Sequence, residues 1–77
     1  MFFNQIEKNK LLSFKHLIKT KGYNEDFVKV NGNIYTYSTK RGAIKNYIGF
    51  NSFNEYKKSE FYPRKVESVN GFYFVAL

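Results

Sequence analysis

Two Asn-Gly dipeptides, Asn31-Gly32 and Asn70-Gly71, constrain the fold of this chain more than any other feature. Each lies between two runs of β-branched and aromatic residues, and that pattern is the strongest short signal for a β-hairpin. The runs cover 27–30 and 34–37 in the first case, and 65–69 and 72–76 in the second. The sequence therefore predicts two antiparallel hairpins.

The first hairpin has two candidate registers. A two-residue turn opposes Val30 with Asn33, whereas a three-residue turn with a bulge opposes Val30 with Ile34. We favour the second register because it places Val28, Val30 and Ile34 on one face of the hairpin.

In that register the other face of the first hairpin carries Lys29, Tyr35 and Tyr37 beside Phe27. Tyrosine provides a large contact area at a low entropic cost, so tyrosine-rich surfaces suit protein interfaces. If no helix covers this face, we expect Lys29, Tyr35 and Tyr37 to form a protein-binding surface.

The segment from Phe3 to Lys19 predicts an amphipathic helix. Its apolar side chains fall within one arc of a helical wheel, as in a helix that packs on a core. These residues are Phe3, Ile6, Leu11, Phe14, Leu17 and Ile18. Gly22 is placed to adopt the left-handed conformation that ends a helix. His16 falls near the solvent face, where we expect an ordinary surface residue.

Helical spacing returns between the hairpins, from Thr39 to about Lys58. Ile44, Tyr47 and Ile48 stand at i, i+3 and i+4, and the tetrapeptide beginning at Ser52 has the Ser-x-x-Glu form of a capping box. We expect two short helices joined by a turn at 49–51, with one bent helix as the alternative. The predicted fold is a single α+β domain over residues 1–77: an N-terminal helix, a β-hairpin, two short helices and a C-terminal β-hairpin.

The charge of the chain is strongly positive: 13 Lys and Arg face 6 Asp and Glu, which gives +7. Such a chain attracts nucleic acid or an acidic protein surface. Eleven of the cations are lysines, which also fits the codon bias of an AT-rich genome. No apolar run approaches the ~20 residues that span a bilayer. We expect a cytoplasmic protein of a bacterial host cell, encoded by a phage or other mobile element, with no membrane partner.

Signals for catalysis are nearly absent from the sequence. There is no cysteine, and the one histidine cannot build a zinc site alone. The acidic residues are scattered, and no Gly-rich phosphate loop is present. We therefore expect a binding protein without catalytic residues, cofactor, metal or small-molecule substrate.

One pattern is similar to the paired tripeptides of GIY-YIG nucleases. Asn33-Ile34-Tyr35 and Tyr47-Ile48-Gly49 correspond to the two tripeptides, with Asn in place of the first Gly. The resemblance implies that the two tripeptides lie on adjacent strands. The helical spacing around Tyr47 predicts a different placement, so we do not expect this nuclease activity.

The order helix, turn, helix, hairpin over residues 38–75 resembles the small winged helix-turn-helix domains of excisionases and of MerR-type and AlpA-type regulators. The matching positions are Thr39, Ala43, Ile48-Gly49, Ser52 and Pro63. The resemblance implies a DNA-binding protein whose second helix enters the major groove while the hairpin touches the backbone. The tip of the hairpin carries no arginine, and the predicted N-terminal helix and first hairpin have no counterpart in that family.

The resemblance implies three groups of nucleic-acid contacts. Asn54, Lys57 and Lys58 would project from the second helix; Lys40, Arg41 and Lys45 would surround the start of the first; Arg64 and Lys65 would bring the hairpin onto the backbone. An alternative of another class is a phage-encoded inhibitor, of the anti-CRISPR or another anti-defence type. It would bind and block a host nucleic-acid-processing protein.

Overall fold

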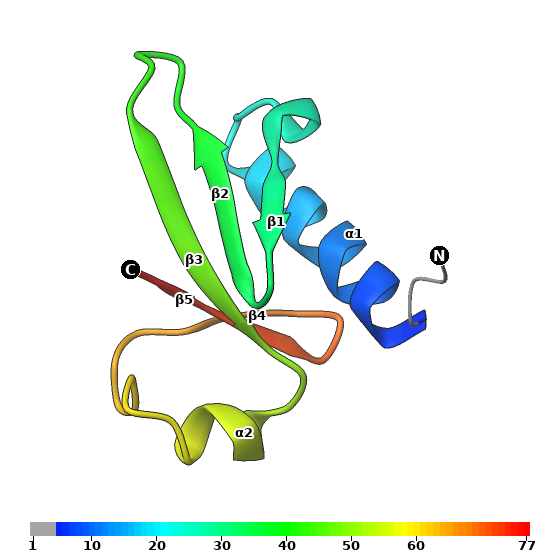
Figure 1. Cartoon of the computed structure of the whole chain (residues 1–77), viewed down its shortest axis with the longest axis vertical. Coiled ribbons are helices and arrows are strands. Elements are labelled where there is room, and N and C mark those ends of the chain that lie inside the picture. Colours follow the sequence, from blue (N-terminus) through cyan, green and yellow to red (C-terminus); the bar gives the residue numbers. More distant parts are fainter. Residues whose placement is uncertain (1–4) are drawn as a thin grey trace.

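A five-stranded antiparallel sheet with one long helix on one of its faces forms the body of the protein (Figure 1). The computed structural model describes residues 5–77. The helices are α1 (Gln5–Thr20), the 3-10 turn η1 (Glu25–Phe27) and α2 (Phe53–Lys57). The strands are β1 (Lys29–Asn31), β2 (Ile34–Ser38), β3 (Ile44–Phe50), β4 (Glu67–Val69) and β5 (Phe72–Ala76). Their order in the sheet is β1-β2-β3-β5-β4, so the α+β class is confirmed.

The predicted N-terminal helix corresponds to α1, while Phe3 lies outside the described residues. Phe14 and Ile18 are fully buried, and His16 is exposed as expected. Gly22 ends the helix with φ of +85°, and the amide of Tyr23 donates to the carbonyl of Ile18. Together with the bond from the Gly22 amide to the Lys19 carbonyl, this is a Schellman motif. The motif fixes the position of Tyr23 directly after the helix.

The first hairpin is present, but its predicted register is wrong. Asn31 pairs with Ile34 and Val30 with Tyr35, so the loop is Gly32-Asn33. Gly32 has φ of +60°, as expected for the first loop position of a type II′ turn. This register places Val30 on the same face as Tyr35. Burial of the two tyrosines of β2 under α1 removes far more apolar area from water than burial of the aliphatic face of Val28, Val30 and Ile34 would remove.

The C-terminal hairpin is confirmed. Val69 pairs with Phe72, and both loop residues have positive φ: +51° for Asn70 and +85° for Gly71. A type I′ turn requires this conformation at both positions, which explains why Asn-Gly occupies them.

The first of the two predicted short helices is wrong, because β3 occupies that segment and lies in the centre of the sheet. Tyr47 and Gly49 face α1, whereas Phe50 packs against Tyr56 and Phe61 on the opposite face. Over residues 47–50, β3 is covered on both faces, and a strand segment of this kind does not alternate between apolar and polar residues, so its pattern also fits a helix.

The second predicted helix is confirmed as α2. The Ser52 hydroxyl accepts a hydrogen bond from the Glu55 amide, and the Glu55 carboxylate accepts one from the Asn51 amide. These contacts cap the start of α2. A helix-turn-helix pair would need a further helix where β3 lies.

Aromatic side chains form the core between α1 and the sheet. The ring of Phe14 packs against four others, with centroid distances of 4.9 Å to Tyr35, 5.4 Å to Tyr47, 5.3 Å to Phe74 and 6.2 Å to Tyr37. The chain thus uses its high aromatic content to build a core in a small domain. Within residues 5–77, no helix is both long and apolar enough to cross a bilayer.

Candidate nucleic-acid interface

Four of the cationic residues predicted from the sequence fall at two ends of the molecule. Lys40 and Arg41 lie in the connection between β2 and β3, whereas Lys57 and Lys58 lie at the end of α2. Figure 1 shows this connection and α2 at opposite ends of the longest axis. Asn54 is also on α2, so the structure separates the residues of α2 from those of the β2–β3 connection.

The β2–β3 connection is a tight turn with Lys40 and Arg41 at its tip. The Thr39 amide donates to the Ala43 carbonyl over 2.8 Å, and the Gly42 amide donates to the Thr39 carbonyl over 2.9 Å. The Thr39 hydroxyl also accepts a bond from the Ala43 amide. Gly42 has φ of +81°, as in a three-residue hairpin loop that ends in a bulge. These three hydrogen bonds among Thr39, Gly42 and Ala43 fix the backbone that carries the two cations.

A surface hollow lies beside this turn. It is lined by Tyr23, Thr39, Lys40, Arg41, Ala43 and Lys45. The ring of Tyr23 packs against that of Tyr37, with a centroid distance of 5.3 Å and an interplanar angle of 39°. Tyr23 is partly exposed, whereas Tyr37 is buried. The hollow therefore combines three cations with the accessible part of an aromatic ring.

A second hollow adjoins the first. It is lined by Lys21, Tyr47, Lys65, Glu67, Phe74 and Ala76. Lys45 and Tyr47 are two positions apart on β3 and so share one face of the sheet. Tyr47 lines the second hollow, and its ring packs against that of Tyr37 with a centroid distance of 5.9 Å.

The carboxylate in the second hollow is already paired. The Lys21 ammonium lies 2.9 Å from Glu67 Oε1, and the Tyr47 hydroxyl donates to Glu67 Oε2 over 2.9 Å. Burial alone would raise the pKa of Glu67, but the hydrogen bonds from Lys21 and Tyr47 and the charge of Lys65 lower that pKa below its ordinary value. The hydrogen bond to Glu67 in turn raises the pKa of Lys21.

Of the two residues predicted to bring the C-terminal hairpin onto a nucleic-acid backbone, Lys65 lines the second hollow. Arg64 is exposed in the segment between α2 and β4, and its carbonyl accepts a hydrogen bond from the Tyr56 hydroxyl.

Sequence reasoning missed Lys21 and Tyr23. Both follow directly from the end of α1, and Gly22 between them marks that end in the sequence. The signal for their position was therefore present. The contact of Tyr23 with Tyr37 was not predictable, because it depends on which face of the sheet α1 covers.

The predicted protein-binding surface of Lys29, Tyr35 and Tyr37 is wrong for both tyrosines. Tyr35 is 1% exposed and Tyr37 is 6% exposed, because α1 packs on the face of β2 that carries both rings. Burial raises the pKa of Tyr35 to about 12. Lys29 is exposed on β1.

The two tripeptides that are similar to those of GIY-YIG nucleases lie on paired strands. Ile34 pairs with Ile48, and Tyr35 pairs with Tyr47. This is the adjacency that the resemblance implies, and the expected helical placement of Tyr47 is wrong. The Tyr35 ring is buried under α1, and the Tyr47 hydroxyl is bonded to Glu67. Within residues 5–77, no three His, Cys, Asp or Glu side chains form a metal-binding group.

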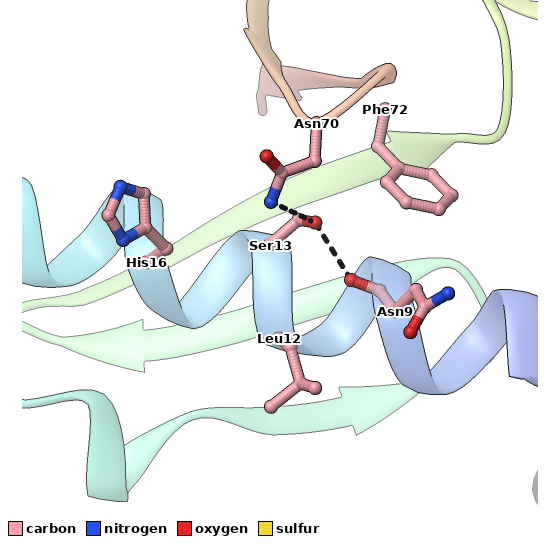
Figure 2. A pocket seen from close by; sticks show the side chains of 6 residues that line it. All are labelled: Asn9, Leu12, Ser13, His16, Asn70 and Phe72. Atoms are coloured by element: carbon pink, nitrogen blue, oxygen red, sulfur yellow. Dashed lines mark hydrogen bonds between the residues drawn. The ribbon is translucent and has the colours of Figure 1, made fainter.

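A third hollow lies between α1 and the β4–β5 turn (Figure 2). It is lined by Asn9, Leu12, Ser13, His16, Asn70 and Phe72. The Asn70 amide donates to the Ser13 hydroxyl over 3.2 Å, and that hydroxyl donates to the Asn9 carbonyl over 2.8 Å. These bonds fasten the turn to the helix. Amide, hydroxyl and apolar groups dominate this lining, so it attracts a polyanion less than the two cationic hollows do.

Comparisons with protein-family models, with curated proteins and with solved structures found no match to this chain.

Proposed function

We propose that this protein binds nucleic acid without catalysing a reaction, and that it does so through one basic end of the molecule. The basic end comprises the cations around the two adjoining hollows: Lys21, Lys40, Arg41, Lys45 and Lys65. The observation that carries the proposal is the convergence of these side chains from the end of α1, the β2–β3 turn, β3 and the start of β4. Glu67, the carboxylate among them, is paired with Lys21, so the group keeps a net positive charge.

A phosphate backbone is the natural partner of such a group. Each phosphate that a cation neutralises releases condensed counterions, so affinity falls steeply as salt rises. Four unpaired cations predict an affinity loss between 50 and 200 mM NaCl of about 50-fold for a single strand and about 150-fold for a duplex. Lysine predominates in the group, which favours contacts with phosphate over readout of base edges.

The first prediction compares two double variants of equal charge. Lys40→Ala with Arg41→Ala removes two cations from the basic end, and Lys57→Ala with Lys58→Ala removes two from α2. We expect the first variant to lose affinity for labelled oligonucleotides by on the order of tenfold. The slope of log affinity against log salt should fall by the equivalent of about two phosphate contacts. The second variant should bind within about twofold of the unchanged protein. Fluorescence anisotropy across a salt series measures both quantities.

Two results would contradict this proposal. Binding that does not respond to salt would exclude phosphate contacts. Unchanged binding by the Lys40 and Arg41 variant, together with a loss in the Lys57 and Lys58 variant, would reject the basic end as the interface and would favour the sequence-based expectation that Lys57 and Lys58 contact the nucleic acid.

One observation favours the second candidate, an inhibitor that binds and blocks a nucleic-acid-processing protein. Phe27 is 61% exposed and Ile44 is 69% exposed, and both line a hollow with Lys29 on the sheet face opposite α1. Exposed apolar side chains beside a cation suit a protein surface that carries some acidic groups. A stoichiometric complex that survives nuclease treatment, and that Phe27→Ser with Ile44→Ser abolishes, would support this candidate. A complex that nuclease dissolves would reject it.

A further inference from the structure

We infer that the basic end binds single-stranded nucleic acid, with one base stacked on the accessible side of the Tyr23 ring. This inference rests on the proposed function and deepens it, because it names the form of nucleic acid and the side chain that receives a base.

The Tyr23 ring is held in place before any ligand arrives. The Schellman motif at Gly22 fixes its backbone, and the ring packs against Tyr37, whose ring in turn packs against Tyr47. The ring of Tyr47 packs against Phe14 in the core. Tyr23 is thus the outermost member of a row of rings that begins in the core. A side chain that is already ordered loses little entropy when a ligand stacks on it.

Cations surround this ring on the surface. Lys40, Arg41 and Lys45 line the same hollow as Tyr23, and Lys21 precedes Tyr23 by two residues. The phosphates on either side of a base that stacks on Tyr23 would therefore meet positive charge. A cationic path with aromatic rings along it is the arrangement by which proteins bind single strands with little sequence preference.

A duplex uses this arrangement poorly. Its bases are stacked on one another, so a tyrosine ring in a hollow reaches no base face unless the helix opens. The cations alone would then provide the affinity. An unpaired chain gains both the phosphate contacts and the stacking, so we expect it to bind more tightly than a duplex of equal length.

The test uses the whole chain and three labelled probes of about 12 nucleotides, a length within the range that single-strand binders cover. They are oligothymidylate, a duplex of the same length, and an abasic sugar-phosphate chain that keeps every phosphate. We expect oligothymidylate to bind about tenfold more tightly than either of the others. Oligouridylate as a fourth probe distinguishes RNA from DNA as the source of the single strand.

Variants of Tyr23 locate the stacking. Tyr23→Leu should weaken oligothymidylate binding about tenfold and leave binding of the abasic chain unchanged, whereas Tyr23→Phe should bind like the unchanged protein. Tyr62→Leu is the matched control, because Tyr62, like Tyr23, is accessible to solvent and its ring packs against a buried one, that of Tyr56. The comparison of probes with the unchanged protein stands even if Tyr23→Leu disturbs the fold.

The outcomes separate this inference from the proposed function. If the duplex or the abasic chain binds as tightly as oligothymidylate and the binding depends on salt, the stacking inference is wrong and the proposed function stands. If none of the probes shows salt-dependent binding, the proposed function itself is wrong.

Discussion

At the scale of single residues, Gly49 shows how little free space the core contains. It lies on the central strand β3, opposite Phe74 on β5. A Cβ atom at this position would lie 2.8 Å from Cε1 of Tyr35 and 3.0 Å from Cε1 of Phe74. Both rings are buried, so neither can move without disturbing its neighbours.

We expect Gly49→Ala to destabilise the protein by about 1–3 kcal/mol, as in other overpacked cores. Ile44→Ala is the control on the same strand, because Ile44 is 69% exposed and its loss should change stability by less than about 0.5 kcal/mol. Urea denaturation followed by circular dichroism measures both values. Equal midpoints for the two variants would show that the rings around Gly49 can relax.

At the scale of elements, Glu67 connects three parts of the fold. Its carboxylate on β4 is bonded to Lys21 after α1 and to Tyr47 on β3. The contact brings the end of the helix to the far edge of the sheet, across β5. An ionised carboxylate accepts these hydrogen bonds more strongly than a protonated carboxyl group does, so the strength of the connection depends on pH.

The pKa of Glu67 lies below its ordinary value of 4.5 in the folded protein. A lowered folded-state pKa means that the stabilisation is complete above the unfolded pKa and is lost as the pH falls through the folded value. We therefore expect stability to decrease on acidification below about pH 5. Glu67→Gln should be less stable at neutral pH and should lose less on acidification. Thermal unfolding of both proteins from pH 7 to pH 3 measures this, and parallel pH profiles would contradict it.

The elements that sequence reasoning identified are those with local signals. Gly22 ends α1, Ser52 begins α2, and Asn70-Gly71 forms the second turn, because each conformation is decided by a few neighbouring residues. β3 was not identified, since its faces are covered by residues far away in the sequence. The register of the first hairpin was wrong for the same reason: contacts of β2 with α1 decide it.

At the scale of the whole molecule, the candidate site was predictable only in part. Lys40, Arg41 and Lys45 are neighbours in sequence and remain together in the structure. Lys21, Tyr23 and Lys65 join this group because α1 packs on the sheet and β4 pairs with β5. No local sequence pattern predicts either of these contacts. Lys40 and Arg41 lie at the opposite end of the molecule from Lys57 and Lys58, and we place the interface on the side of Lys40 and Arg41, where the Tyr23 ring accompanies the cations.

The strand order has a consequence for how the protein folds. The pairs β1–β2, β2–β3 and β4–β5 join strands that are consecutive in the chain, and only β3 with β5 joins strands that are not. Pairings between consecutive strands form early because they close short loops. A pairing between distant strands closes a longer loop, which costs more chain entropy. The union of β3 with β5 is therefore expected to be the slow step of folding. Because α2 packs against β3 and β5, its early formation would shorten the flexible loop that this step has to close.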